Sequence, residues 1–150
     1  MLKLSRKTLL ALEAVLEIAY TSDSEPVQAK EITSRQGVPQ RYLEQVMQQL
    51  VRAGILKGVR GPRGGYRLAR ERKEISVGDV VRVAQSLDDN GESFDGGSLL
   101  GRVVVMPLMS SLQDGVMAKL NEISIEDICR RARDSGLDCG ATGAIADFAL

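Results

Sequence analysis

The sequence predicts a mainly α-helical fold with a small two-stranded β wing, that is, a winged helix-turn-helix followed by a long dimerisation helix. Three observations predict this fold: two helical patterns joined by a turn at Gly37, a glycine-rich hairpin that carries two arginines, and a long amphipathic pattern in the second half of the chain. The 150 residues suffice for one domain with its own hydrophobic core and an additional oligomerisation arm.

Two helices are expected before the turn. In residues 5–20 apolar side chains recur at helical spacing, with Leu9 on the inward face and Ser5 as the N-cap. A polar loop that ends in a proline separates this helix from a short one over residues 28–36. Gly37 is expected to end the short helix, because glycine readily adopts the left-handed backbone conformation that closes helices.

A third helix is expected over residues 39–53, with Pro39 as its first residue because that position needs no amide hydrogen. Its apolar face is expected to be buried and comprises Leu43, Val46, Met47 and Leu50. The opposite face is polar, and its side chains are donors and acceptors of the kind that read base edges in the major groove. The candidate DNA-contacting residues of this region are Gln28, Pro39, Gln40, Arg41, Tyr42, Glu44 and Gln45.

Two short strands are expected after this helix, over residues 55–59 and 66–68, and they form the wing. Between them, glycines and a proline impose a turn from which two arginines project, and a thin hairpin of this kind admits an arginine to the narrow minor groove. The candidate DNA-contacting residues of the wing are Arg60, Gly61, Pro62, Arg63, Gly64, Gly65 and Tyr66. Lys57 and Arg67, on the strands, are assigned to phosphates or to plain solvation.

A further helix over residues 76–87 is expected to close the winged DNA-binding domain of residues 1–87. Ser76 and Asp79 stand at the spacing of a capping box at its start.

The rest of the chain is expected to form the arm. An acidic, glycine-rich loop (88–98) leads to the dimerisation helix (99–123). The apolar stripe of that helix needs another surface to cover it, and a second copy of the chain supplies one most simply. A helix that begins at Ser124, capped by that serine with Asp127, and a weakly patterned tail account for residues 124–150.

Charge is divided between the two halves of the chain, although the formal net charge is zero. Residues 1–75 carry fourteen Lys and Arg against eight Asp and Glu, whereas residues 76–150 carry six against twelve. Between Arg41 and Lys73, nine basic residues face only two acidic ones. This local concentration favours a polyanionic partner such as double-stranded DNA over an uneven but merely solvated surface.

The sequence contains no histidine, which excludes Ser-His-Asp triads, Cys-His dyads and His-containing zinc sites within a single chain. We therefore do not expect an enzyme. No apolar run approaches the roughly 20 residues of a membrane span, and the N-terminus lacks the pattern of a secretory signal. A cytoplasmic protein without membrane contact is expected.

Several stretches resemble the Rrf-two family of bacterial winged-helix regulators, which includes the IscR, NsrR and CymR types. The resemblance covers about residues 1–130 and is carried by Tyr42-Leu-Glu-Gln45, by Val59-Arg-Gly-Pro-Arg-Gly-Gly-Tyr66 and by Leu120-Asn-Glu-Ile-Ser-Ile-Glu-Asp127. It implies a transcription regulator, with a repressor favoured, that binds two half-sites on duplex DNA as a homodimer. It also implies that Glu44 and Arg60 contribute to the choice of DNA site.

The chain departs from the family pattern in its iron–sulfur ligands. Members that bind a two-iron two-sulfur cluster carry three cysteines in the loop before the long helix and often a histidine early in that helix. Here residues 88–98 contain no cysteine, and Met106 stands at the histidine position. Because such clusters normally need thiolate ligands, neither a cluster nor another metal cofactor is expected.

Two alternative functions stay open. Cys129 has basic neighbours that favour a thiolate, so Cys129 and Cys139 are candidates for a thiol-based redox sensor, although a lone cysteine beside isoleucines is more often a core residue. A winged helix also serves in some proteins as a protein-interaction module. The sequence does not identify an effector, whether a small molecule or a regulatory protein.

Overall fold

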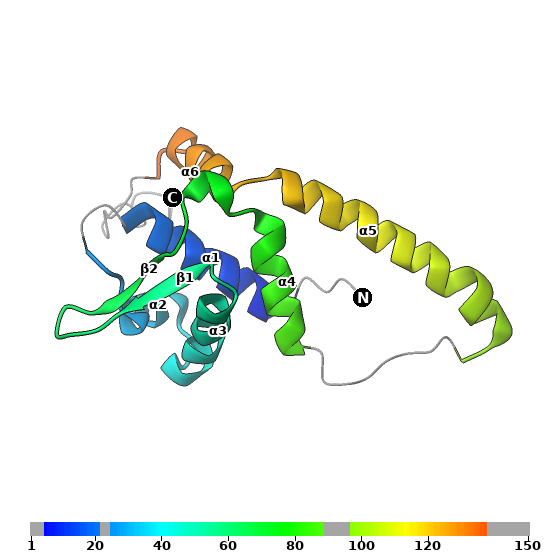
Figure 1. Cartoon of the computed structure of the whole chain (residues 1–150), viewed down its shortest axis with the longest axis horizontal. Coiled ribbons are helices and arrows are strands. Elements are labelled where there is room, and N and C mark those ends of the chain that lie inside the picture. The colour runs from blue at the N-terminus through cyan, green and yellow to red at the C-terminus, as the bar shows by residue number, and fades with distance from the viewer. Residues whose placement is uncertain (1–4, 22–24, 89–96, 138–150) are drawn as a thin grey trace.

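The computed structural model describes residues 5–21, 25–88 and 97–137, and it confirms a mainly helical fold with a two-stranded antiparallel sheet. The helices are α1 (Arg6–Thr21), α2 (Ala29–Gln36), α3 (Gln40–Arg52), α4 (Val77–Asp88), α5 (Met106–Glu122) and α6 (Ile125–Asp134), with short helical segments η1 (Arg72–Glu74) and η2 (Gly101–Val105). The strands are β1 (Leu56–Val59) and β2 (Gly65–Leu68). Figure 1 shows the hairpin and α5 projecting from the rest of the molecule in opposite directions.

The expectations for most of the acidic loop and for the tail, including Cys139, lie outside the described residues. We use the term winged body for α1 to α4, the β1–β2 hairpin and α6 together.

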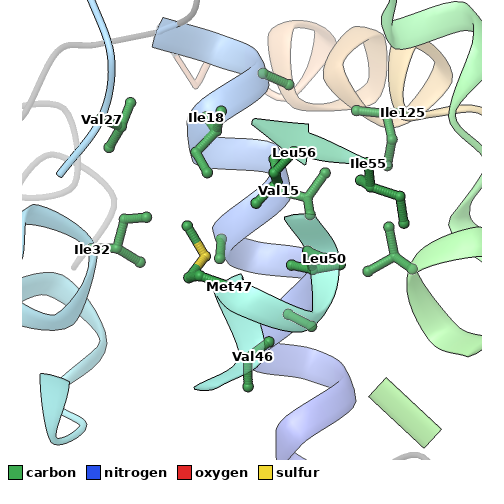
Figure 2. Close-up of a cluster of buried hydrophobic side chains, with 14 of the residues drawn as sticks. Val15, Ile18, Val27, Ile32, Val46, Met47, Leu50, Ile55, Leu56 and Ile125 are labelled. Carbon is green, nitrogen blue, oxygen red and sulfur yellow. The ribbon is translucent and has the colours of Figure 1, made fainter. Parts of the chain in front are cut away.

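The hydrophobic core lies between α1, α3, β1 and the start of α6, as Figure 2 shows. The apolar face predicted for α3 is confirmed, because all four of its residues are buried: Leu43, Val46, Met47 and Leu50. Val15 and Ile18 of α1 join this cluster, and Ile125 contributes to it from α6. Each large apolar side chain that is removed from water contributes roughly 1.5–3 kcal/mol, so this cluster is the main stabilising element of the winged body.

The inward face predicted for α1 is partly wrong. Leu9 is 52% exposed, whereas the adjacent Leu10 and Ala11 are buried. This segment has apolar residues at most positions, so helical spacing alone did not identify the buried side. Packing decides it, because α1 contacts α2, α3, α4, α6 and β2 and therefore buries a broad side that includes Thr8.

The helix ends follow the predicted capping pattern with one change. Ser5 Oγ accepts the amide of Thr8 at 3.4 Å, and Gly37 adopts a φ of 67° while its amide donates to the Thr33 carbonyl at 2.8 Å. Pro39 is the N-cap of α3 and not its first helical residue, because its ψ of 135° is extended. Its carbonyl closes the first turn from outside by accepting the amide of Tyr42 at 3.1 Å.

The long helix is continuous from Leu99 to Glu122, although its turns are not uniform. Over η2 the helix is wider than a regular α-helix, and the amide of Met106 donates to the carbonyl of Gly101, five residues earlier. Pro107 follows directly, and its ring would clash with the preceding turn of a regular helix, so the wide turn accommodates it. No residue of η2 or α5 is buried.

After α5 the chain returns to the winged body. Residues 75–77 and 123–125 exchange two backbone hydrogen bonds of 2.8 Å, which attach the start of α6 beside the start of α4. Both predicted serine–aspartate caps are present as reciprocal hydrogen bonds of 3.0 Å, between Ser76 and Asp79 and between Ser124 and Asp127. The bonds from Ser124 hold the pKa of Asp127 below its ordinary value.

Candidate nucleic-acid interface

The turn between α2 and α3 presents α3 at the surface. Its left-handed residue, Gly37, ends α2, and Val38 is buried, so the turn is anchored in the core. The α3 helix then buries its apolar side against the core cluster and leaves its polar side outward. This is the arrangement of a helix-turn-helix, whose second helix fits the major groove of DNA.

The outward side of α3 brings together the residues predicted to read bases. Four of them are exposed: Pro39, Gln40, Arg41 and Gln45. Tyr42 and Glu44 are half-buried. They lie on opposite flanks of the helix, because Tyr42 is close to α1 and the charge of Glu44 acts on the wing residue Tyr66.

Lys7 of α1 is a candidate contact that the sequence analysis missed. Its ammonium nitrogen lies 5.8 Å from the centre of the Tyr42 ring, within reach of a cation–π attraction. The first turns of α1 thus place a positive charge beside α3. A lysine near a helix start is also typical of a solvated helix end, so nothing in the local sequence distinguishes the two roles.

Gln40 and Glu44 form a hydrogen-bonded pair on the flank of α3 that faces the wing. Gln40 Nε2 donates to Glu44 Oε1 at 2.9 Å, with the i, i+4 spacing of neighbours along a helix. Partial burial, and secondarily the negative charge of Glu44, raises the pKa of Tyr66 above its ordinary value. The Tyr66 hydroxyl therefore stays neutral over the physiological pH range.

The tip of the wing is a narrow exposed turn. All four of its leading residues are exposed: Arg60, Gly61, Pro62 and Arg63. Gly61 has a φ of 115°, which glycine adopts without strain, and its carbonyl accepts the amide of Gly64 at 2.9 Å. A Cβ on Gly64 would collide with the carbonyl of Val59, so the turn is too tight for a side chain there. The wing therefore carries its two arginines on a thin support.

Strand β2 of the wing pairs with a third segment that the sequence analysis did not predict. Val27 and Tyr66 exchange backbone hydrogen bonds of 3.0 and 2.8 Å. A Cβ on Gly65 would lie 2.5 Å from the carbonyl oxygen of Val27, so this approach requires glycine. Gln28, which is half-buried, follows as the N-cap of α2. The pairing ties the wing to the start of α2 and gives Gly65 a packing role.

Lys57 and Arg67 face each other across the hairpin. With residues 68–74 and Glu126 they line an open hollow of about 710 Å³ beside the wing. Within it Arg72 forms an ion pair with Glu126 at 3.6 Å. Both cations therefore belong to a mixed-charge surface on the strands and not to the outward side of α3.

The donor residues do not fit a conventional iron–sulfur cluster. Cys129 is 0% exposed, and the Tyr20 hydroxyl donates to its backbone carbonyl at 2.8 Å, so this thiol is a core residue under α1. The sequence has only one other cysteine, Cys139, outside the described residues. Within residues 5–21, 25–88 and 97–137, no group of three or more His, Cys, Asp or Glu side chains is placed to hold a metal ion.

The same described ranges include no helix with the length and hydropathy of a membrane span.

Comparisons with known proteins agree with a helix-turn-helix fold. The model of the Rrf2 family, described as an iron-dependent transcriptional regulator, matches residues 4–131. The chain is 33% identical over 131 residues to the HTH-type transcriptional regulator IscR of Vibrio atlanticus, covering 86% of this chain and 76% of that protein. It is 34% identical over 129 residues to IscR of Cronobacter sakazakii, covering 85% and 80%.

Solved structures give the same result. The structure of T. potens IscR matches with a TM-score of 0.71 and 32% identity, covering 97% of this chain and 96% of that one. CymR, described as the global cysteine regulator of B. subtilis, matches with a TM-score of 0.67 and 30% identity, covering 87% and 98%.

Proposed function

Because the chain belongs to the Rrf2 family of DNA-binding transcriptional regulators, we propose that it is a repressor that acts as a homodimer on a two-half-site operator in duplex DNA. The observation that carries this proposal is the placement of two different reading elements. An outward polar helix, α3, and a thin arginine-bearing hairpin are built on one core, and the pairing of Val27 with Tyr66 ties the hairpin to the start of α2.

The two elements divide the reading of DNA between the grooves. A helix fits the major groove, where the exposed side chains of α3 meet base edges with a distinct donor and acceptor pattern. The narrow wing suits the minor groove, where Arg60 or Arg63 is attracted by the enhanced negative potential. Lys7 and Lys57 are assigned to phosphates, which fix register but carry no sequence information.

A second copy of the chain is the proposed occupant of the α5 surface. The exposed apolar residues of η2 and α5 are Val103, Val104, Val105, Leu108, Met109, Leu112 and Val116. Contiguous apolar surface of this kind marks an interaction site, and a two-fold axis lets one surface cover its own copy. Two winged bodies held in this way would address two half-sites of an operator.

The regulatory signal of this repressor is proposed to act without a conventional cluster, because residues 88–98 provide no thiolate and Cys129 is buried. Anaerobic purification followed by iron and sulfide analysis tests this statement. A colourless, iron-free protein that binds its operator is expected. A stoichiometric cluster would overturn the ligand argument while leaving DNA binding intact.

The test of DNA recognition measures how Arg60→Ala and Lys57→Ala change the affinity for a specific duplex and for a random duplex. The affinity of the wild type for duplex DNA should fall steeply between roughly 50 and 200 mM salt, and the wild type should bind one sequence more tightly than others. We expect Arg60→Ala to weaken the specific duplex by about 1–3 kcal/mol with little change on random duplex, and Lys57→Ala to weaken both alike. Equal losses for Arg60→Ala on both duplexes would remove its reading role, and absence of duplex binding at low salt would favour a protein-interaction module.

A further inference from the structure

Two side chains on the polar side of α3, Gln40 and Glu44, are hydrogen-bonded to each other in the free protein. Gln40 Nε2 donates to Glu44 Oε1 at 2.9 Å, and the structure gives the second carboxylate oxygen of Glu44 no hydrogen-bond partner among the described residues. A carboxylate accepts hydrogen bonds and donates none, so the bond fixes Gln40 with its amide nitrogen toward Glu44. The pair thus presents a free acceptor, Glu44 Oε2, whose position is set by Gln40.

The surroundings of the pair restrict where that acceptor can point. Glu44 is half-buried, and Tyr66 of the wing lies close enough for the Glu44 charge to affect its hydroxyl. Leu43 and Met47, adjacent on the helix, are fully buried and hold this flank against the core. Gln40 is exposed at the start of α3, the end of a recognition helix that reaches base edges.

We infer that Gln40 is a positioning residue for base reading: its amide holds the Glu44 carboxylate so that one position of each half-site is read as cytosine. This inference rests on the proposed DNA-binding function. In the major groove cytosine offers only its N4 amino donor, which a carboxylate accepts. Thymine offers an O4 acceptor and guanine offers O6 and N7, all of which repel a carboxylate, and adenine places its N7 acceptor beside its N6 donor.

Without Gln40 the carboxylate loses the partner that selects one of its rotamers. A free glutamate near the surface samples several staggered conformations, and only some of them reach the N4 group. The loss should therefore appear as reduced discrimination at one base position and not as a uniform loss of affinity. A merely structural role of Gln40 would lower thermal stability or weaken every duplex alike.

The experiment uses the full chain and a random duplex library, from which the wild type selects its preferred sequence. Affinities are then measured for that duplex and for every single base-pair substitution in one half-site. The variants are Glu44→Gln, which keeps the shape and removes the charge, and Gln40→Met, which keeps the length and removes the donor. Gln48→Met is the matched control, because Gln48 is exposed on the same helix and has no hydrogen bond to a carboxylate of the described residues.

The wild type should prefer cytosine over thymine by about tenfold at one position, which is within the discrimination of a good base contact. Glu44→Gln should abolish that preference, and Gln40→Met should lower it to about threefold at the same position with an unchanged melting temperature, since a single hydrogen bond has this order of effect. The double variant should show the same lack of preference as Glu44→Gln alone, because Gln40 acts through Glu44 and its loss then has no further effect on base discrimination. Gln48→Met should keep the wild-type preference.

Two outcomes would overturn the inference while the proposed function stands: full wild-type discrimination in Gln40→Met, or a change at a base position that Glu44→Gln does not affect. A wild type that binds duplex DNA without selecting any sequence would instead contradict the proposed operator-binding function.

Discussion

The winged body and the long helix differ in how much of their apolar surface one chain covers. In the winged body the core residues of α1, α3 and β1 are almost fully removed from water. In η2 and α5 no residue is buried, although the segment is rich in leucine, valine and methionine. The apolar surface of the winged body is therefore covered within one chain. The apolar surface of the helix that is proposed to join two chains would be covered only in the dimer.

This difference implies two separate kinds of sensitivity. We expect a substitution in the winged body to change the folding of each chain, and a substitution on α5 to change the proposed association of two chains. The pairing of residues 75–77 with 123–125 marks the boundary, because there the chain leaves the exposed helix and returns to the core. Substitutions on the two sides of this boundary test the distinction.

A charge on the exposed apolar surface of α5 gives the largest expected effect. Leu112 is 56% exposed in the single chain, and the proposed homodimer buries it in both copies. Leu112→Asp would require two unpaired carboxylates to be removed from water in each dimer. We expect the dimer dissociation constant to rise at least about 1000-fold, roughly 4 kcal/mol, as measured by sedimentation equilibrium.

Ser110→Asp is the matched control for this substitution. Ser110 is exposed on the same helix, two residues earlier and on a different side, so the added charge stays in water. We expect its dissociation constant to be close to that of the wild type. A dimer that tolerates Leu112→Asp as well as Ser110→Asp would show that a different surface joins the two copies.

The second-largest effect is expected in the free energy of unfolding, when a leucine of the core and a leucine of α5 are each truncated to alanine. Leu50 is 0% exposed in the core, whereas Leu108 is 56% exposed on α5. In the Leu112→Asp background, where association is removed, Leu50→Ala should lower the free energy of unfolding by about 3 kcal/mol and Leu108→Ala by less than about 0.5 kcal/mol. Urea denaturation at one protein concentration measures both. Similar losses would mean that α5 is packed within the single chain after all.

The sequence predicted well those elements whose signals are local and periodic. The buried side of α3 was identified residue by residue, because its four apolar positions alternate with polar ones at helical spacing. The two capping boxes and the turn at Gly37 were predicted because serine, aspartate and glycine at these spacings have a specific backbone role. The arginines and glycines of the wing were recognised for the same reason.

The features that were missed depend on residues distant in the sequence. A single bridging residue such as Val27 has no period, so its pairing with Tyr66 could not be read from local pattern. Lys7 lies beside Tyr42 only because α1 crosses α3 in the folded chain. The exposure of Leu9 likewise depends on which of several apolar sides of α1 the other helices cover.

The close contact between Gly65 of the wing and Val27 provides a test within the winged body. A Cβ on Gly65 would lie 2.5 Å from the carbonyl oxygen of Val27, whereas a Cβ on Gly58, in the facing strand, would meet nothing within 4 Å. Overpacking of this kind typically costs about 1–3 kcal/mol, so Gly65→Ala should displace the wing and weaken binding to the selected duplex roughly tenfold. Fluorescence anisotropy titration measures the loss.

Gly58→Ala should leave both duplex binding and the melting temperature near those of the wild type. In each variant the dimer dissociation constant should be unchanged, because the hairpin projects away from α5 (Figure 1). Equal affinity of Gly65→Ala and Gly58→Ala for the selected duplex would mean that the contact with Val27 does not position the wing.

The smallest expected effect concerns the boundary itself. The Ser124 hydroxyl accepts the amide of Asp127 at 3.0 Å, and loss of such an N-cap costs about 1 kcal/mol of stability. Ser124→Ala should therefore lower the free energy of unfolding of the winged body without changing the dimer dissociation constant. Ser135→Ala, at the other end of α6, removes only an exposed bond to the Arg131 carbonyl and is the control.

The pH dependence of this loss identifies its source. The hydrogen bonds from Ser124 lower the pKa of Asp127 in the folded protein, so the stability they contribute is present at neutral pH, above the unfolded carboxyl pKa. It is lost as the pH falls through the lower folded value, because the carboxyl group then becomes protonated in both states. Ser124→Ala removes the side-chain bond but keeps the backbone amide, which is the larger cause of the lowered pKa, so the difference between wild type and Ser124→Ala in urea denaturation should shrink only slightly on acidification. A difference that is constant with pH would assign the whole loss to the bond between the Ser124 hydroxyl and the Asp127 amide. A change in the dimer dissociation constant would instead place residue 124 on the α5 side of the boundary.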